Sequence, residues 1–159
     1  MKNLQKELEK TINYDFRNKD LLKQSLIHKS FDNINNNEKL EFFGDRVLGL
    51  VISKKLIEIY PEEKEGIIDK KYANLVNKKT CLAIALKVDI KKFMTLGASQ
   101  ASLQRSADKI MSDCLEAIIG AIYLDGGPKY AEKFVLSFWK HDLDNSVLPT
   151  VDAKTQLQE

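Results

Sequence analysis

Apolar residues recur every three to four positions along most of this chain, which is the spacing that places them on one side of an α-helix. Alternation of apolar and polar residues, which would indicate a half-buried strand, does not persist in any segment. We therefore predict an all-α fold. The predicted helices cover residues 21–27, 38–60, 67–86, 107–124 and 129–147.

Residues that favour helix ends lie at the boundaries of these segments. Asn18 precedes the first helix and suits an N-cap, and the Asn-rich stretch 32–37 is a loop that could cap the second helix. Pro61 should stop the second helix, because proline lacks the N–H that a helix interior needs. The run Asp125-Gly126-Gly127-Pro128 should end the fourth helix. Residues 96–106 are interpreted as an irregular connection.

The composition is that of an ordinary globular domain. The 159-residue chain can bury its own core, with 43% hydrophobic and 30% charged residues. A formal net charge of +2 does not by itself indicate a nucleic-acid binder. Cys81 and Cys114 match no metal-ligand spacing, and we expect reduced thiols in a cytoplasmic protein. No signal peptide is visible, and apolar runs stay far below the ~18 residues of a membrane span, so neither export nor membrane insertion is expected.

The candidate chemistry lies in carboxylates inside the two most apolar predicted helices. Glu41 and Asp45 are four residues apart and share one helix face, with Glu38 one turn earlier on the same side. Asp113 and Glu116 are three residues apart and share a face of the other helix. Helices this apolar must be largely buried, and an ionised carboxylate that is buried without a partner costs several kcal/mol. These acids therefore need a counterion.

A bound divalent cation would compensate all four charges together. Ligand sets made only of oxygen select hard ions, so Mg²⁺ is expected first and Mn²⁺ second. Three alternatives stay open: Glu38 could favour the helix dipole, Asp113 and Glu116 could flank a solvent face, and one acid could be protonated. Asp45 lies two turns into its helix, beyond the reach of the dipole. The basic residues close in sequence are few: Lys39, Arg46 and Lys109. A di-iron bundle is excluded, because neither histidine occupies a Glu-x-x-His position.

Glycines and lysine pairs add two weaker expectations. Gly49 and Gly120 continue the two acidic faces, and a glycine inside a helix costs ~1 kcal/mol against alanine. We expect a close backbone approach as the reason for keeping them. The pairs Lys70-Lys71, Lys78-Lys79 and Lys91-Lys92 are interpreted mainly as solvated charges, although some could touch phosphate.

Residues 37–45, NEKLEFFGD, closely resemble the signature stretch of bacterial ribonuclease III. The resemblance continues through residues 25–31, 65–66, 73–77 and 113–127, and so covers nearly the whole chain. It implies a ribonuclease III-type helical endonuclease domain.

The resemblance also implies boundaries and site residues. The endonuclease domain would cover residues 1–148, and residues 149–159 would be a linker and the start of a truncated double-stranded-RNA-binding domain. Within the first domain, the metal ligands would be Glu41, Asp45, Asp113 and Glu116. Asp45 and Glu116 would be the most critical for catalysis, and Glu38 and Glu65 would be auxiliary acids. Residues 97–105 lack the family's usual glycine-glutamate start, so their RNA contacts are not assigned.

The implied activity is Mg²⁺-dependent hydrolysis of phosphodiester bonds in double-stranded RNA, such as ribosomal RNA precursors. A homodimer would leave 5′-phosphate and 3′-hydroxyl ends with two-nucleotide 3′ overhangs. Phe42, Phe43 and Leu50 are candidates for the subunit contact, because their helix is more apolar than burial of one face requires. The alternative is a catalytically silent RNA-binding or ribosome-associated module of the same fold, whose expected mark would be loss of the acids.

Overall fold

The computed structural model describes residues 2–97 and 107–146. Helices account for all regular secondary structure in this part, apart from an isolated parallel bridge between Ile27 and Thr95. The predicted all-α fold is thus confirmed. The elements are α1 (Lys2–Ile12), α2 (Lys19–Ser25), α3 (Glu38–Ile59), α4 (Glu65–Val76), α5 (Lys78–Val88), the 3₁₀ turn η1 (Ile90–Phe93), α7 (Ala107–Gly126), α8 (Pro128–Phe138) and α9 (Lys140–Asn145).

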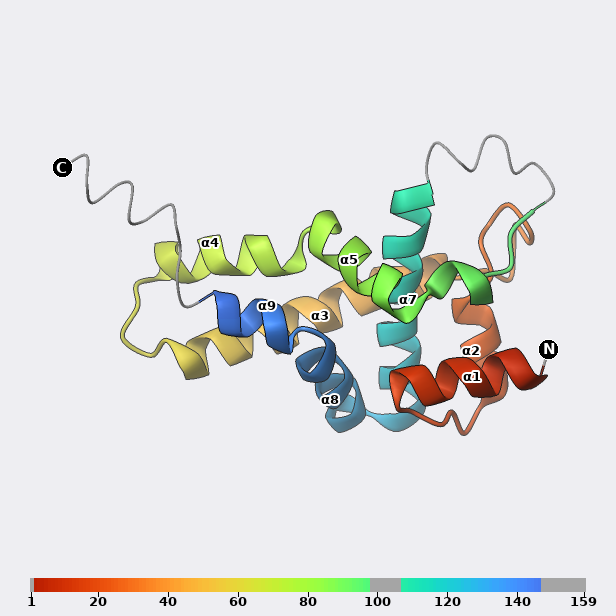
Figure 1. Cartoon of the computed structure of the whole chain (residues 1–159), viewed down its shortest axis with the longest axis horizontal. Helices are drawn as coiled ribbons and strands as arrows, with labels where there is room; N and C mark the ends of the chain where they lie inside the picture. Colours follow the sequence, from red (N-terminus) through yellow and green to blue (C-terminus); the bar gives the residue numbers. More distant parts are fainter. Residues whose placement is uncertain (1, 98–106, 147–159) are drawn as a thin grey trace.

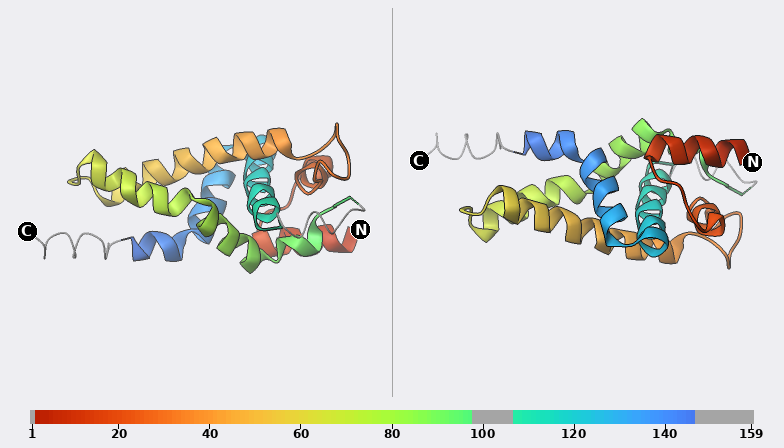
Figure 2. Two further views of the ribbon diagram at one scale, coloured as in Figure 1. Left: turned by 90° about the horizontal axis from the view of Figure 1, so that it is seen from above. Right: turned by 90° about the horizontal axis from the view of Figure 1, so that it is seen from below.

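The two helices that carry the candidate acids, α3 and α7, cross at the centre of the molecule (Figure 1). Seen from above, α7 is viewed end-on, with α3 on one side and α5 on the other (Figure 2). Every residue from Ile110 to Ile122 is buried except Asp113, which is partly buried. The central helix therefore has almost no solvent-facing side, which explains why its sequence is so apolar.

Backbone contact between two glycines sets the crossing of α3 and α7. A Cβ added to Gly44 would lie 1.7 Å from the backbone carbonyl oxygen of Glu116, and one added to Gly120 would lie 2.4 Å from that of Leu40. The close approach predicted at Gly120 is confirmed. Gly49 instead faces the Tyr72 hydroxyl, 2.6 Å from the position of an added Cβ. The tightest contact is at Gly44, which the sequence did not single out.

Two predicted helices are each divided in two. The segment 67–86 is interrupted at Asn77, whose extended backbone ends α4 and whose side chain accepts the Thr80 N–H at 2.9 Å to cap α5. The segment 129–147 bends at Trp139, which is fully buried and donates its indole N–H to the Leu75 carbonyl at 2.8 Å. α1 and η1 are not among the predicted elements.

The predicted helix ends agree closely with the structure. Asn18 accepts the Asp20 N–H at 3.0 Å, and Asn36, within the Asn-rich loop, accepts the Glu38 N–H at 3.0 Å. α3 ends at Ile59, two residues before Pro61. The Asp125 carboxylate at the end of α7 ties down the loop before α2, accepting the Arg17 and Asn18 N–H groups, each at 2.9 Å, and the Tyr14 hydroxyl at 2.5 Å.

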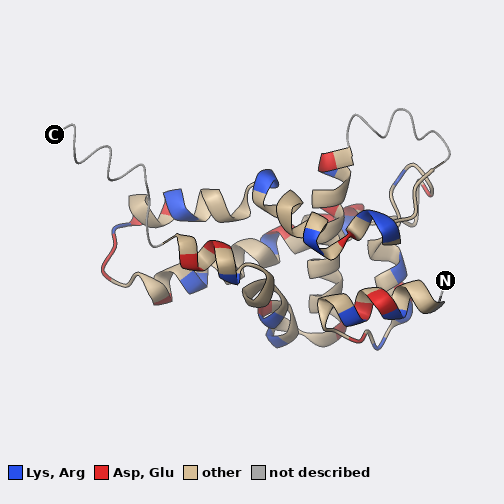
Figure 3. Cartoon of the chain, in the orientation of Figure 1, with Lys and Arg blue, Asp and Glu red and all other residues tan. Residues whose placement is uncertain are grey.

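The cysteines and the charged residues lie where the composition led us to expect them. Cys81 and Cys114 are both buried free thiols. Lys and Arg alternate with Asp and Glu along most of the described helices (Figure 3). In the described ranges we find no helix whose length and apolar character would let it cross a membrane. Most of the predicted connection 96–106, and all of the predicted segment 149–159, lie outside the described residues.

Candidate metal centre at the crossing of two helices

Three of the predicted acids meet where α3 and α7 cross. Glu41 of α3 and Asp113 and Glu116 of α7 each offer a carboxylate oxygen, and these oxygens all lie within 4.8 Å of one another. The Glu116 side chain is 2% exposed, whereas those of Asp113 and Glu41 are 19% and 30% exposed. The group therefore opens to solvent on one side and is closed on the other. We call these three residues the carboxylate cluster.

Asp45 lies at the edge of the carboxylate cluster. It lies one turn after Glu41 on α3, and a hydrogen bond with its carboxyl group is one of the causes that raise the pKa of Glu116. Its side chain is 52% exposed and pairs with Arg46 Nη1 at 3.3 Å. Arg46 also stacks on Phe42, with its guanidinium carbon 3.8 Å from the ring centre.

A lysine from a third helix reaches into the carboxylate cluster. Lys78, the first residue of α5, places its Nζ 2.6 Å from Asp113 Oδ1, 2.8 Å from Glu116 Oε1 and 4.0 Å from Glu41 Oε1. Lys109 binds the other Asp113 oxygen, Oδ2, at 2.6 Å. The prediction for Lys78 as mainly a solvated charge is wrong. Lys78 lies 35 residues from Asp113 in sequence, and only the packing of α5 on α7 brings the two together.

The titration behaviour of these groups reflects burial and crowding. Burial and a hydrogen bond with Asp45 raise the pKa of Glu116 to about 8, against the opposing effect of Lys78. Burial and the neighbouring Asp113 raise the pKa of Glu41. Burial acts to lower the pKa of Lys78, but its hydrogen bonds to Asp113 and Glu116 outweigh burial and raise that pKa. The carboxylates are thus under-compensated, which favours binding of further positive charge.

Two predicted auxiliary acids do not join the carboxylate cluster. Glu38 and Glu65 are both exposed, and the cluster found among the described residues includes neither. Glu38 is the first residue of α3, one turn before Glu41. Glu65 begins α4, next to the end of α3 that lies far from α7 (Figure 1). Within one chain, Glu65 is therefore remote from the carboxylate cluster.

The donor set fits a hard divalent cation. It consists of carboxylate oxygens, the ligands that Mg²⁺ and Mn²⁺ prefer, and the one open side would admit water and a substrate phosphate. Cys81 of α5 is fully buried, and burial raises the pKa of its thiol to about 12. This cysteine would therefore not act as a thiolate ligand. The residues present thus suit a magnesium or manganese ion.

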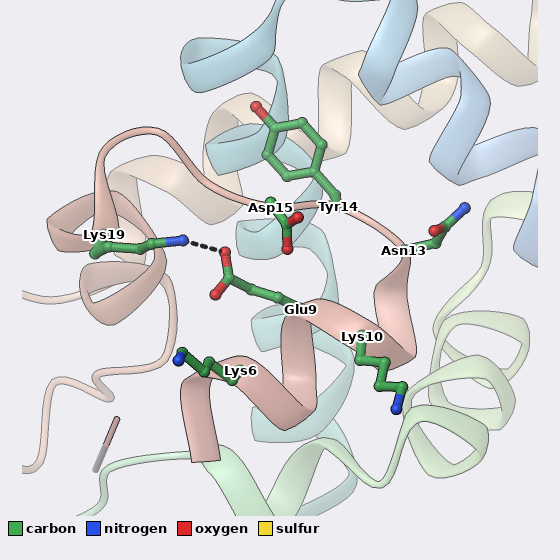
Figure 4. Close-up of a pocket in the computed structure, with 7 residues that line it drawn as sticks. All are labelled: Lys6, Glu9, Lys10, Asn13, Tyr14, Asp15 and Lys19. Carbon is green, nitrogen blue, oxygen red and sulfur yellow. Dashed lines mark hydrogen bonds and ion pairs between the residues drawn. The ribbon is translucent and has the colours of Figure 1, made fainter. Parts of the chain in front are cut away.

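A separate cavity lies between α1 and the loop that follows it (Figure 4). Its volume is about 620 Å³, and three lysines line it together with Glu9, which is 3% exposed. The Glu9 carboxylate already accepts the Phe16 N–H at 2.6 Å and the Lys19 ammonium at 2.7 Å. Its acceptor capacity is used in holding the loop to α1. Glu9 therefore fastens the loop to α1, and we assign no catalytic role to the residues that line this cavity.

Comparison with known proteins agrees with the fold. The model of the family described as Ribonuclease-III-like matches residues 18–143. Ribonuclease 3 of Pelagibacter ubique (strain HTCC1062) is 53% identical over 153 residues, covering 96% of this chain and 69% of that protein. Ribonuclease 3 of Ehrlichia ruminantium (strain Welgevonden) is 42% identical over 157 residues, covering 96% and 69%.

Solved structures give the same result. The nuclease domain of ribonuclease III from Campylobacter jejuni superposes with a TM-score of 0.81 at 37% identity, covering 86% of this chain and 96% of that one. A second crystal structure of that nuclease domain gives a TM-score of 0.80 at 38% identity. A helical nuclease domain is the class that these likenesses define. The chain belongs to the ribonuclease III family.

Proposed function

We propose that this chain is a divalent-metal-dependent endoribonuclease that cuts double-stranded RNA. The observation that carries the proposal is the meeting of Glu41, Asp113 and Glu116 oxygens within 4.8 Å, with Asp45 beside them, in a chain of the ribonuclease III family. Mg²⁺ is the proposed ion and Mn²⁺ its substitute. Asp45 and Glu116 are the proposed catalytic residues, and all four acids are the proposed metal ligands.

The chain's own residues supply the framework for phosphodiester hydrolysis. When bound, Mg²⁺ lowers the pKa of a water molecule and neutralises charge on the phosphate. Glu116 is buried in the most apolar helix, so its carboxylate has little freedom to move and would hold the ion on the closed side. Asp45 is about half exposed, and its carboxylate would help to hold the ion on the side where the substrate would arrive. The products would carry 5′-phosphate and 3′-hydroxyl groups.

We propose that two chains act together as a homodimer. Three apolar residues of α3 lie seven to eight positions apart and therefore on one helix face, and each is largely exposed: Phe42 (59%), Leu50 (64%) and Ile57 (60%). Phe43, also predicted as a contact, instead packs inward against Tyr123 with ring centres 5.1 Å apart. One Campylobacter jejuni structure is described as showing structural flexibility in a region of that nuclease domain involved in dimer formation. A pair of sites in one groove would leave two-nucleotide 3′ overhangs.

The mixed surface charge predicts modest RNA affinity. A net charge of +2 and interleaved acids and bases offer few phosphate contacts, so binding should be weak, and it should weaken further as the salt concentration rises (Figure 3). Duplex RNA is recognised mainly by shape, backbone and 2′-hydroxyls. Structured precursors such as ribosomal RNA in the cytoplasm are the proposed substrates. Residues 149–159 are the proposed linker and start of a double-stranded-RNA-binding domain, which would add affinity.

Glu38 and Glu65 are proposed as auxiliary acids near the RNA groove. Both are exposed, which suits residues that meet the substrate or its bound cations rather than the buried ion. Because Glu65 lies far from the carboxylate cluster of its own chain, its contribution would fall to the other site of a dimer.

A cleavage assay tests the proposed function. The chain should cut a duplex RNA with Mg²⁺, should leave the matching single strand intact, and should stop when a chelator is added. Glu116→Gln should abolish cleavage while sparing the fold, and Glu62→Gln, at an exposed turn after α3, should cut normally. Normal turnover by Glu116→Gln with Mg²⁺ would refute the assigned role.

One observation favours the second candidate, a catalytically silent RNA-binding or ribosome-associated module. Lys78 and Lys109 already neutralise part of the acidic charge without a metal ion. Such a module would bind duplex RNA equally well with Mg²⁺ and with chelator, and would cut it with neither. The presence of all four acids makes the enzyme the better-supported candidate.

A further inference from the structure

The ammonium of Lys78 and a divalent ion need the same oxygen atoms. Lys78 Nζ lies 2.6 Å from Asp113 and 2.8 Å from Glu116, and 4.0 Å from Glu41. These three residues are the ones whose oxygens are close enough together to hold one ion. Lys109 differs, because it binds only the outer oxygen of Asp113 and comes from one turn earlier on the same helix.

We propose that Lys78 is a built-in competitor for the metal site, so that a divalent ion binds only by displacing the Lys78 ammonium from the carboxylate cluster. This inference rests on the metal-binding role proposed above. Its consequence is a threshold: the chain needs more free Mg²⁺ to load its site than it would need without Lys78. The lysine compensates part of the charge on these acids when the concentration of free divalent ion is low.

Charge and geometry both favour displacement over coexistence. A monovalent ammonium and a divalent ion a few ångströms apart, beside a nearly buried glutamate, would repel strongly. Lys78 is able to leave, because its side chain is 56% exposed and its four-carbon stem is flexible. Glu116, at 2% exposure, cannot follow the lysine into solvent. The ion pair therefore opens from the lysine side.

The size of the effect follows from the bonds that the ion must break. Lys78 makes two charge-assisted hydrogen bonds, and one such bond is worth on the order of tenfold in an equilibrium constant. Rehydration of the released ammonium offsets part of that loss. Replacing Lys78 with methionine, which keeps an unbranched stem and removes the charge, should therefore tighten divalent-ion binding about tenfold.

Isothermal titration of the full chain with Mn²⁺ tests this inference. The set comprises the unmodified chain, Lys78→Met, the matched control Lys79→Met at the adjacent exposed lysine, and Glu116→Gln. We expect about tenfold tighter binding by Lys78→Met, unchanged binding by Lys79→Met, and loss of binding by Glu116→Gln. Unchanged or weaker binding by Lys78→Met, while Glu116→Gln still abolishes binding, would overturn the competitor and leave the metal site intact. Failure of the unmodified chain to bind Mn²⁺ at millimolar concentration would overturn the metal site and the inference with it.

A measurement on the unmodified chain guards against misfolding of Lys78→Met. The ¹⁵Nζ resonance of Lys78 should report its ion pairs without Mg²⁺ and should move toward that of a free solvated lysine when Mg²⁺ saturates the site. The resonance of Lys79 should stay in place. A Lys78 resonance that does not move at saturating Mg²⁺ would overturn the proposal.

Discussion

Gly44→Ala tests whether the backbone contact of α3 with α7 assembles the carboxylate cluster. The added Cβ would lie 1.7 Å from the Glu116 carbonyl oxygen, 2.6 Å from its carbonyl carbon and 2.9 Å from the Gly120 nitrogen, whereas ordinary contact begins at 3.4 Å. All three atoms belong to the α7 backbone, so no side chain can rotate away. The helices must therefore separate by roughly 1.7 Å, the difference between the two distances.

The cost of this steric overlap is partly offset by the higher helix propensity of alanine. Alanine is better than glycine in a helix interior by about 1 kcal/mol. Forcing one extra carbon into a packed contact usually costs about 1–3 kcal/mol, and more where backbone must move. Because only backbone can move at Gly44, we take a cost of about 3–4 kcal/mol, and after the gain of about 1 kcal/mol we expect Gly44→Ala to lower the free energy of unfolding by about 2–3 kcal/mol, which is roughly 5–10 °C in Tm for a chain of this size.

Gly66→Ala is the matched control. Gly66 also lies in a helix, but a Cβ added there meets no atom within 4 Å. It should stabilise the chain by up to about 1 kcal/mol, because only helix propensity changes. Urea denaturation and thermal melting measure both variants.

The same substitution should weaken the metal site. Metal–ligand distances tolerate only about ±0.2 Å, far less than the expected separation of the helices. Mn²⁺ titration of Gly44→Ala should show clearly weaker binding, with Gly66→Ala unchanged. Gly44→Ala with the stability and Mn²⁺ affinity of the unmodified chain would refute the view that this contact assembles the cluster.

Three further predictions concern the surrounding structure. Burial acts to raise the pKa of Asp125, but hydrogen bonds from the Tyr14 hydroxyl and two backbone N–H groups outweigh it and lower that pKa. The contribution of ionised Asp125 to the stability of the fold is therefore complete above the unfolded pKa of about 3.9 and is lost as pH falls through the lower folded pKa. In urea denaturation, Asp125→Asn should lower the free energy of unfolding by about 1–3 kcal/mol at pH 7 and by progressively less below pH 4. Leu50→Asp should leave the fold intact, because Leu50 is 64% exposed, but should yield a monomer by sedimentation at micromolar concentration; a persistent dimer would contradict the α3 interface. Asn77→Ala should lower stability by about 1 kcal/mol through loss of the α5 cap, and an unchanged denaturation midpoint would contradict that role.

Local sequence pattern was sufficient to predict the parts of the fold that depend on neighbours along the chain. α3 ends near Pro61, and Glu41 lies one turn before Asp45, because helix ends and helix faces are local properties. The break at Asn77 has a local signal too, since asparagine is a strong N-cap residue. α1 also has one, because Leu8 and Ile12 are four residues apart and both become buried. The pattern in α1 could have been recognised.

The remaining features depend on which helices meet. Gly44 differs from Gly49 only in facing the α7 backbone, and no local pattern distinguishes the two. Lys78 belongs to a lysine pair that resembles any solvated pair until α5 packs beside α7. The sequence named three acids that meet, Glu41, Asp113 and Glu116, but it also placed Asp45 among them, and it did not predict that Lys78 would meet them.

The most direct test of the metal centre is a crystal structure of the chain soaked in Mn²⁺, read by anomalous scattering. We predict a peak at the crossing of α3 and α7, bound by oxygens of Glu41, Asp113 and Glu116, with Asp45 in direct or water-mediated contact and the Lys78 ammonium withdrawn. An anomalous map with no peak at this crossing at millimolar Mn²⁺, or with the ion bound elsewhere, would contradict a metal centre at these carboxylates.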